Sequence, residues 1–412
     1  MRILLINHYA GSERLGMEYR PYYLAREWAR MGHEVCIVAA SYAHVRTGQP
    51  ETTQAFHREK HEGISYIWLK TPAYHGNSLG RILNILVFLG RLFFYTRRLV
   101  KEVRPDLVIA SSTYPFDVWF AARIARKAAC RLVYEVHDLW PLSPMELGGY
   151  SRWHPFIMAA QRAEDDAYQR ADYTVSLLPA TLPHMQGRGL KPERWHHIPN
   201  GVNMEEWKDV TPLDPDLKAQ LDAIRQQYAF IVGYAGAHGV ANALESFILT
   251  ASQTGMQQVA FVLAGKGPEK ERLIRQAADK GLSQVFFLPP VPKKQVPALL
   301  SRMDALYIGL QDQPLFRFGV SPNKLFDYMM AEKPVIYAIR SGNDLVGEAG
   351  CGISIPPQDP LSIRDAISQI MNMTEAARLE MGRKGSAFVA SQHDYRVLAA
   401  QFLRIVQTDH HP

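Results

Sequence analysis

The stretch GVSPNKLFDYMMAEKPVI, residues 319–336, combines a turn, a helix and a buried strand in immediate succession. Pro322 interrupts the chain just before the helical pattern, and the apolar run KPVIYAI follows it as a strand. Four polar residues crowd the start of this helix: Ser321, Asn323, Lys324 and Asp327. A purely structural unit needs a cap at this place, but neither a lysine nor a carboxylate beside it. The pattern predicts a site for a ligand that carries both phosphate and hydroxyl groups.

Short apolar runs alternate with helical patterns on both sides of this stretch. RILLI leads into the helix RPYYLAREWARM, where Pro21 suits the first helical position, and VCIVAA follows after Gly32. Similar runs recur along the chain: DLVIAS, RLVYEV and YTVSLL, then FIVGYAG, QVAFVLAG, VFFLP and ALYIGL. Continuous Val, Ile and Leu runs between helices are typical of parallel sheets that are buried on both faces. The sequence therefore predicts an α/β protein with two doubly wound, Rossmann-like domains facing across a cleft.

The chain of 412 residues is too long for one ordinary core, and two domains of about 200 residues each are expected. The boundary is predicted near WHHIPNGVNMEEW, a polar segment that contains Pro199-Asn200-Gly201. We expect an N-terminal domain over 1–200 and a C-terminal domain over 201–385. Residues 386–412 are predicted to form a C-terminal helix that packs back on the N-terminal domain.

Composition restricts the classes of protein to which this chain can belong. Apolar residues make up 47% and charged residues 21%, which is typical of a globular protein. Cys36, Cys130 and Cys351 are too few and too scattered for a disulfide framework or a zinc site, and they suit a reducing cytoplasm. The first 200 residues carry a net charge of +7 and the remainder −1, so the first half is expected to meet an anionic partner.

Segment 79–104, LGRILNILVFLGRLFFYTRRLVKEVR, contains six Arg or Lys residues and one Glu among apolar residues. Arg81 and Arg91 interrupt it, and the apolar run between them is far shorter than the roughly 20 residues that span a bilayer. Two interpretations remain open: an amphipathic helix of the core, or a helix lying in the membrane interface. The second predicts contact with an anionic membrane surface.

Two glycine-bearing loops lie between predicted strands and helices of the second half. Gly236 and Gly239 in VGYAGAHGVANALESFI would let backbone N–H groups approach a phosphate, and Lys266 in LAGKGPEKERL could reach one. Neither loop matches the dinucleotide fingerprint or the P-loop motif. Each loop alone is common without a ligand. Three anion-compatible junctions in one domain, counting the one at Lys324, together favour a binding site.

Histidines occur in two settings where they could be functional, one beside an acidic residue and one resembling part of a metal site. YEVHDLWP places His137 and Asp138 at the end of an apolar strand, where a cap or a partly buried pair is the ordinary structural interpretation. His8 and the pair His196–His197 show no metal-ligand spacing with nearby Cys, Asp or Glu. We therefore expect no metal.

The second half resembles the nucleotide-sugar domain of the retaining GT-B glycosyltransferases related to glycogen synthase. In that family, a helix beginning near E-A-x-A-x-G-K-P-V-I carries a glutamate that binds the ribose. DYMMAEKPVI fits this pattern, with Asp327 in place of the glutamate. A second family glutamate, eight positions earlier, touches the sugar, and that position falls on Gly319, which has no side chain.

SPNKLFDYM resembles a narrower branch, the bacterial surface-polysaccharide transferases, some of which move N-acetyl-fucosamine-type sugars in O-antigen and capsule assembly. INHYAGSERLGMEYRPYYLA, YEVHDLWPLSP and GAHGVANAL are similar to the same branch, so the likeness covers nearly the whole chain. It implies an acceptor-binding first domain and a donor-binding second domain. It implies transfer of a sugar, with retention, from a UDP-type donor to a polyprenyl-diphosphate-linked oligosaccharide.

The resemblance also implies roles for individual residues. His137, Asp138 and Lys324 are expected to be catalytic. The donor is expected to contact Gly236, Gly239, Lys266, Ser321, Asn323, Lys324 and Asp327. Gly11, Gly16 and Glu18 lie in a loop that reaches toward the diphosphate and the acceptor in the family. No cofactor, metal or nucleic acid is expected, and the enzyme would be cytoplasmic, peripheral on the inner membrane face.

Two other functions are compatible with these residues. A nucleotide-sugar epimerase of the same fold would need an acidic or histidine base around the sugar and has no use for a membrane-facing helix. A catalytically degenerate, membrane-associated binding protein would fit the missing carboxylate at Gly319. Turnover of the donor without an acceptor would favour the epimerase, and nucleotide binding without turnover would favour the binding protein.

Overall fold

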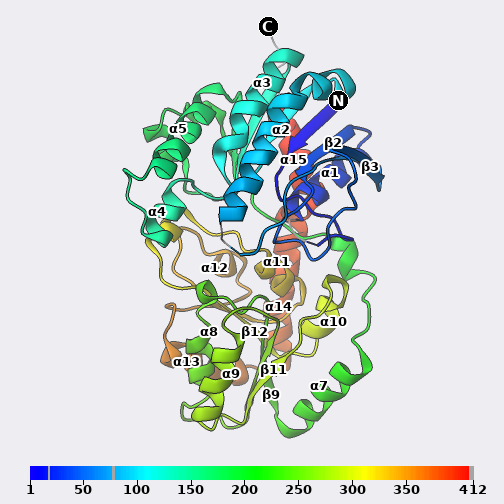
Figure 1. The fold of residues 1–412 in the computed structure, drawn as a ribbon. Coiled ribbons are helices and arrows are strands. Elements are labelled where there is room, and N and C mark those ends of the chain that lie inside the picture. The colour runs from blue at the N-terminus through cyan, green and yellow to red at the C-terminus, as the bar shows by residue number, and fades with distance from the viewer. Residues whose placement is uncertain (17–18, 77–78, 408–412) are drawn as a thin grey trace. The chain divides into compact units, whose positions relative to one another are not determined.

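The computed structural model describes residues 1–16, 19–76 and 79–407. The chain forms two compact units, one comprising Met1–Asn200 together with the chain from Tyr395 onward, the other comprising Gly201–Asp394 (Figure 1). Each unit has its own sheet and its own helices.

The first unit contains an eight-stranded sheet in the order β3-β4-β2-β1-β5-β6-β7-β8. Its strands are β1 (Arg2–Ile6), β2 (Glu34–Ala40), β3 (Phe56–His61), β4 (Ile64–Leu69), β5 (Leu107–Ala110), β6 (Arg131–Val136), β7 (Tyr173–Ser176) and β8 (Trp195–His197). All neighbours pair in parallel except β3, which is antiparallel to β4. Strand order reverses between β1 and β5, so the carboxyl ends of these two strands border a topological switch point.

Helices cover both faces of this sheet. They are α1 (Arg20–Arg30), α2 (Leu79–Val103), α3 (Val118–Ala128), α4 (Leu142–Gly148), α5 (Pro155–Arg170), α6 (Leu182–Gly187) and α15 (Tyr395–Gln407), with short 3-10 turns at Pro115–Asp117 and Pro192–Arg194. Ile3 and Leu5 of β1 belong to the core cluster that holds Trp28 of α1 and Phe402 of α15. Successive strand residues point to opposite faces, so α2, α3 and α5 cover the other face (Figure 1).

The second unit contains a six-stranded parallel sheet in the order β11-β10-β9-β12-β13-β14. Its strands are β9 (Phe230–Ala235), β10 (Val259–Ala264), β11 (Val285–Leu288), β12 (Ala305–Gly309), β13 (Val335–Ala338) and β14 (Gly352–Ser354). Its helices are α7 (Pro215–Gln227), α8 (Leu244–Thr250), α9 (Lys270–Asp279), α10 (Val296–Leu300), α11 (Asn323–Met330), α12 (Leu345–Ala349), α13 (Pro360–Met371) and α14 (Glu375–Gln392). Four 3-10 turns complete the unit: Met204–Trp207, Val240–Asn242, Lys293–Gln295 and Pro314–Phe318.

Two apolar clusters hold the second sheet, one on each face. Residues of α8, α9 and α13 pack with Val232 and Tyr234 of β9. Residues of α7, α10, α11 and α14 pack with Ile231, the residue just before Val232, whose side chain points to the opposite face. Both faces of the sheet are therefore buried, as the continuous apolar runs predicted.

The prediction of two doubly wound, Rossmann-like α/β domains is confirmed, because both sheets are essentially parallel with helices on both faces. The sequence patterns did not indicate β3 and its hairpin to β4. FHREKH has only one large apolar residue, and the turn between the strands is Glu62-Gly63, both with positive φ (49° and 80°), which is the geometry of a type I′ turn.

The C-terminal region differs from the expected boundary at residue 386. That position falls inside α14, which continues to Gln392 within the second unit. The chain returns to the first unit only at Tyr395, where α15 begins and packs on α1. Gly382 and Gly385 of α14 explain why this helix stays with the second unit: a Cβ at either position would crowd the backbone at Glu332 or Met329.

Replacing Phe402 by Ala should destabilise the first unit by about 3–5 kcal/mol, because its ring is fully buried against Trp28 with centroids 5.2 Å apart. Hydrogen exchange followed by mass spectrometry should show faster exchange in α1 and α15. The matched control is Phe94→Ala, since Phe94 is 77% exposed in the same unit. Equal stability of the two variants would contradict this account of α15.

Candidate functional site

The strand order of the second sheet reverses between β9 and β12, and the site predicted from sequence lies at the carboxyl end of β9. Ligands of such sheets bind outside the carboxyl ends of the strands at this switch point. The loop after β9, residues 236–243, and the loop after β10, residues 265–269, both start at this edge. The helix α11 brings Lys324 to the same place.

Lys324 is held by two residues of the β9 region. Its Nζ donates to the Tyr234 hydroxyl at 2.9 Å and to Oδ1 of Asn242, and it lies 4.8 Å from the centre of the Tyr234 ring. Tyr234 and Asn242 in turn both donate to the carbonyl oxygen of Ala237. Burial lowers the pKa of Lys324 to about 8. No carboxylate neutralises this ammonium among the contacts of the described residues, so a bound anion would meet an available cation.

The two glycine loops lie backbone against backbone. Gly236 N–H donates to Ala264 at 3.0 Å, and His238 N–H donates to the carbonyl of Lys266 at 2.9 Å. A Cβ at Gly265 would overlap the carbonyl oxygen of Gly236, and a Cβ at Gly267 would overlap the His238 backbone. Glycine is therefore required at these positions by close approach. The loops expected from two separate motifs form one surface, and Gly236 lies against the Lys324 side chain.

His238 is a buried residue of this surface that the sequence patterns did not single out. Burial, with Lys270 and Lys324 nearby, lowers its pKa to about 4, so its ring is neutral at physiological pH. Neither ring nitrogen finds a hydrogen-bond partner among the described residues. A buried polar group without a partner is costly, and such groups concentrate at functional sites. In the sequence, the glycines on either side of this histidine indicated a binding loop, but nothing indicated a role for the histidine itself.

The start of α11 carries the other polar residues predicted there. Pro322 occupies the N-cap position, where its ring cannot accept a hydrogen bond from the helix. Ser321 is half-buried and Asn323 is exposed at the first helical position. Lys266 is exposed, and its neighbour Lys270, which the sequence patterns missed, is the lysine that anchors this loop by donating to the carbonyls of Gly265 and Leu288.

Asp327 lies one turn after Lys324 on α11 but faces a different neighbour. Both of its carboxylate oxygens lie 2.6 Å from Nζ of Lys293, and Glu206 lies 3.9 Å from the same ammonium. The structure therefore does not bring Asp327 to the partners of Lys324. Lys293, from the segment PKKQ, was not predicted, because nothing in a single sequence pairs positions 34 residues apart.

The missing carboxylate at Gly319 has a conformational cause. Gly319 has φ of +99°, in the region that favours glycine, and it ends the 3-10 turn Pro314–Phe318. Any other residue at this position would be strained.

The first unit brings His137 into a buried network at the carboxyl edge of its sheet. His137 Nε2 lies 3.1 Å from Glu135 Oε2 and 3.0 Å from Ser111 Oγ, and the Ser111 hydroxyl donates to the same carboxylate oxygen at 2.6 Å. Since both neighbours offer acceptors, Nε2 carries the proton. Burial would raise the pKa of Glu135, but Arg20, His137 and Ser111 lower it to about 2. The carboxylate thus stays ionised and orients the imidazole.

The other residues predicted in this unit lie in different environments. Asp138, next to His137, is exposed. Gly11 is buried, and its carbonyl accepts a hydrogen bond from Tyr66 at 3.0 Å. Gly16 has φ of +85°, and a Cβ there would crowd the Thr47 hydroxyl, so its backbone geometry requires glycine. Glu18 lies outside the described residues.

Asp117 is a further acidic residue at this edge, and the sequence patterns did not indicate it. Its carboxyl group is fully buried at the start of α3 and accepts from the Ser112 N–H at 3.2 Å. Burial raises its pKa to about 7. His8, at the end of β1, is also buried, and its Nδ1 lies 2.5 Å from the Tyr114 hydroxyl. Burial lowers the pKa of His8 to about 3, which makes it a neutral core histidine.

Within residues 1–16, 19–76 and 79–407, no three His, Cys, Asp or Glu side chains gather where they could hold a metal ion. The triplet Asp214-Pro215-Asp216, whose spacing occurs in some metal-binding motifs, begins α7, and Asp214 accepts a hydrogen bond from Gln295 at 3.3 Å.

The lowered pKa of Lys324 predicts a pH dependence for binding of a diphosphate such as UDP. The ammonium is present below about pH 8 and is lost as pH rises through this value, so affinity should fall toward pH 9. Lys324→Arg should bind with little change over that range, because a guanidinium stays charged. Lys324→Met should bind about tenfold or more weakly at neutral pH. Titration calorimetry measures all three.

The control for this experiment is Lys280→Met, which removes an exposed lysine at the end of α9 in the same unit. Its affinity and pH profile should equal those of the unsubstituted protein. Identical pH profiles for the Lys324→Arg and unsubstituted proteins would remove Lys324 from the binding site.

Comparison with known families gives two matches in sequence. Residues 16–201 match the family of glycosyl transferase 4-like domains, and residues 228–373 match the glycosyl transferases group 1. A curated relative is WcaI of Escherichia coli strain K12, whose own assignment as a colanic acid biosynthesis glycosyl transferase is provisional. It is 24% identical over 289 residues, which cover 68% of this chain and 69% of WcaI.

Solved structures show the same fold. A sucrose-phosphate synthase from Thermosynechococcus elongatus superposes with a TM-score of 0.74 at 17% identity, covering 98% of each chain. HepE of Anabaena in complex with UDP superposes with a TM-score of 0.67 at 16% identity, covering 99% of this chain and 100% of HepE. At these identities the likeness establishes the fold alone. The two family matches together span the greater part of the sequence, and the chain belongs to the glycosyltransferases of the GT-B fold.

Proposed function

We propose that this glycosyltransferase moves a sugar from a UDP-type nucleotide donor to a lipid-linked oligosaccharide during synthesis of a bacterial surface polysaccharide. The observation that carries the proposal is the position of Lys324 at the switch point of the second sheet, beside the two glycine loops. A diphosphate placed there would meet a cation and backbone N–H groups together.

The charge on the leaving group decides what the site must do. When the bond between the sugar and the nucleoside diphosphate breaks, negative charge grows on the departing phosphate oxygen, and fixed positive groups stabilise it. Lys324 supplies such a charge, and the exposed Lys266 can add to it. The N–H groups of Gly236 and His238 already donate to backbone carbonyls, so the amides that could add to it from this loop are those of Ala237 and Gly239. Because Tyr234 and Asn242 hold the ammonium in place, little reorganisation is needed during the reaction.

Asp327 is the residue that we propose for the ribose of the donor. Its carboxylate is already held by Lys293, but two oxygens offer about four acceptor positions, and one ammonium does not use all of them. A diol could therefore donate to Asp327 while the ion pair stays intact. The ion pair would also keep the carboxylate charged when a ligand excludes water from it.

The first unit would bind the acceptor through His137 and Asp138. His137 is held by Glu135 and Ser111, so its ring is positioned before any ligand arrives. We propose that transfer proceeds with retention by attack on the front face of the sugar, with the departing phosphate accepting the acceptor's proton. This route does not use the pair of carboxylates found in glycosidases.

The comparisons support the choice of substrate class. WcaI is provisionally assigned to the synthesis of colanic acid, and HepE has been solved with UDP and with UDP-glucose. By analogy we propose a UDP-linked sugar as donor, with N-acetyl-fucosamine or a related N-acetyl sugar suggested by the SPNKLFDYM motif. The acceptor would be a polyprenyl-diphosphate oligosaccharide, and the enzyme would work at the inner face of the cytoplasmic membrane.

The proposal is tested by incubating the protein with a panel of nucleotide sugars and lipid-linked acceptors and measuring product mass. We expect one donor–acceptor pair to give a product heavier by one sugar residue, with release of UDP. Conversion of the donor sugar without any acceptor would replace the proposal by an epimerase. Tight nucleotide binding without turnover of any donor would replace it by a binding protein.

A second experiment tests the acceptor side. His137→Ala and Ser111→Ala should both lower kcat while the UDP affinity of the second unit stays unchanged, because each variant disturbs the imidazole in the first unit only. Ser111→Ala should have the smaller effect, since it removes hydrogen bonds worth roughly 1 kcal/mol each and leaves the ring in place. His57→Ala, on the edge strand β3, is the control. Normal transfer by a folded His137→Ala protein would make the network purely structural.

A further inference from the structure

The large hydrophobic side chains that remain exposed are concentrated on one part of the first unit. Among the described residues, ten of seventeen such side chains lie on α2 or around the connection between α4 and α5. Those on α2 are Leu79, Ile82, Leu83, Leu86, Phe93 and Phe94. The others are Leu147 at the end of α4, Tyr150 and Trp153 on the connection, and Met158 in the first turn of α5. The other seven are scattered over the rest of the chain, which is normal for a soluble protein and needs no explanation.

The helix α2 has one face in the core and one face outside. Phe88, Leu92 and Leu99 are fully buried against the unit, while Phe94 is 77% and Leu86 59% exposed. Among the described residues, α2 is the one helix that is long and apolar enough to cross a membrane, by length and composition only. Because its inner face packs on the sheet and on α3, the outer face can reach lipid only by lying along the surface of a bilayer.

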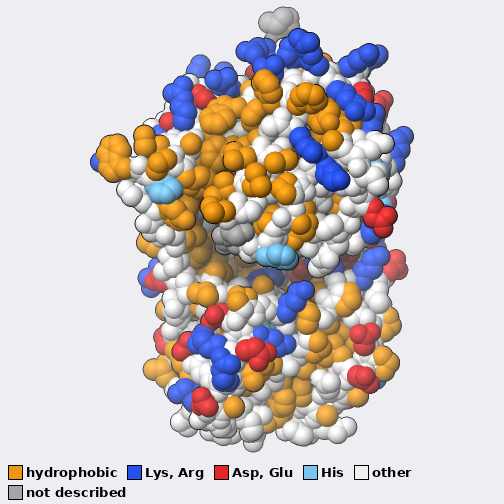
Figure 2. All heavy atoms as spheres, viewed as in Figure 1, with side chains coloured by type: hydrophobic (Ala, Val, Ile, Leu, Met, Phe, Trp, Pro, Cys, Tyr) orange, Lys and Arg blue, Asp and Glu red, His pale blue; other side chains and the backbone are white. Residues whose placement is uncertain are grey.

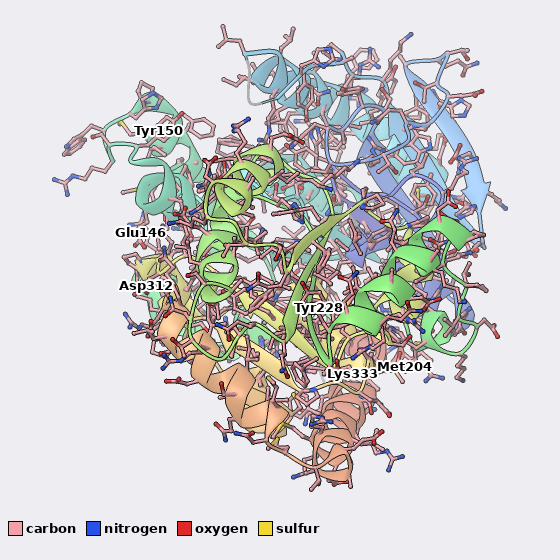
Figure 3. All side chains as sticks on the ribbon, turned by 90° about the horizontal axis from the view of Figure 1, so that it is seen from below. Glu146, Tyr150, Met204, Tyr228, Asp312 and Lys333 are labelled. Atoms are coloured by element: carbon pink, nitrogen blue, oxygen red, sulfur yellow. The ribbon has the colours of Figure 1, made fainter. Side chains whose placement is uncertain are left out.

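The connection between α4 and α5 adds a second apolar element, which the sequence patterns did not indicate. Trp153 is 68% and Tyr150 47% exposed, and the Arg152 guanidinium lies 4.7 Å from the centre of the Trp153 ring. Figure 3 shows Tyr150 on a segment that projects from the body of the unit. No acidic residue occurs from Leu147 to Arg162. Exposed Trp and Tyr beside arginines are typical of the membrane–water interface.

Helix α3 connects the two elements into one surface. It contacts both α2 and α5, and its Phe120 lies 6.4 Å from Phe93 between ring centres. The guanidinium of Arg123 lies 4.6 Å from the Phe93 ring. Figure 2 shows hydrophobic side chains gathered over this region of the unit, with Lys and Arg along its upper margin. We call the outer face of α2, with Phe120 and residues 147–158, the apolar face.

The charges around the apolar face indicate what covers it. The last turns of α2 carry Arg97, Arg98 and Lys101, and Arg104 follows directly. Helix α3 ends with the exposed Arg126 and Lys127. The acidic residue of α2, Glu102, is paired with Arg58 and Arg98. A second copy of this chain would bring the same cations against these, whereas anionic lipid headgroups would neutralise them.

We propose that the apolar face docks on an anionic lipid bilayer, with α2 lying in the interface and Trp153 and Tyr150 inserted as a second, separate contact. This inference deepens the proposed function, because a polyprenyl-linked acceptor is held in such a bilayer. Two contacts on one rigid unit fix its orientation as well as its distance from the lipid. The test uses neither donor nor acceptor, so its outcome is independent of whether sugar transfer is found.

Trp153 provides the measurement, because it is the only exposed tryptophan of the seven in the chain. Vesicles of phosphatidylglycerol and phosphatidylethanolamine should shift the tryptophan emission to shorter wavelength, and lipids brominated in the acyl chain should quench it. Both signals should disappear in Trp153→Phe, which should still sediment with the vesicles. Vesicles of phosphatidylcholine alone should bind more weakly, and binding should decrease with added salt.

Two variants separate the contacts. Tyr150→Ser with Trp153→Ser should weaken vesicle binding by about tenfold, since interfacial aromatic residues contribute strongly to it. Arg97→Glu with Lys101→Glu should weaken binding by at least about tenfold at low salt, because two attractive charges become repulsive. Leu361→Ser is the control, an exposed apolar residue of α13 in the second unit. It should bind vesicles like the unsubstituted protein.

Three results would overturn the proposal. One is equal vesicle binding by the unsubstituted protein and both double variants. Another is binding without any change in the emission of Trp153, which would limit the contact to α2. The third is a dimer in solution that the Tyr150→Ser, Trp153→Ser variant dissociates and that does not bind vesicles, since the apolar face would then join two copies of the chain.

Discussion

The ion pair between Arg20 and Glu135 lies wholly inside the first unit, and the carboxyl edge of that sheet depends on it. Two buried charges are tolerated only when their remaining hydrogen-bonding capacity is satisfied. Arg20 meets this condition by also donating to the carbonyls of Ile198 and Pro199, the last residues before the chain leaves the unit at Asn200. One guanidinium therefore fixes the start of α1, the end of β6 and the exit of the chain. The Glu135 carboxylate of this ion pair also orients the ring of His137.

In the second unit, the arrangement depends on how closely the backbone of two glycine loops approaches Lys324. Glycine at 265 and 267 lets two loops approach more closely than any side chain would allow. The same crowding leaves the ring of His238 without a hydrogen-bond partner among the described residues and keeps it neutral. Lys324 is then a partly buried cation at this edge, held by a phenol and an amide. Neutral partners hold the ammonium without cancelling its charge.

The fold could be predicted from the sequence because its signals are local. Runs such as RILLI and RLVYEV became β1 and β6 with unchanged limits, and Pro21, expected at the first position of α1, lies one residue later in its first turn. The sequence also singled out Lys324 at the start of α11 and the two glycine loops that lie between a strand and a helix, and the structure places these groups side by side. Partners that are distant in sequence were not predicted: these are Lys293, which pairs with Asp327, and Arg20, which pairs with Glu135. A side chain's partner depends on tertiary packing, which no short pattern encodes.

The antiparallel hairpin at one margin of the first sheet has a consequence for how the protein behaves when crowded. A strand at the margin offers unpaired N–H and C=O groups on which another chain can add a strand. Here one margin is β3, FHREKH, whose charged side chains Arg58, Glu59 and Lys60 disfavour such addition. The other margin is β8, which has only three residues. A sheet that ends in this way is a poor template for aggregation. Many copies can therefore share a small area without their sheets fusing into fibrils.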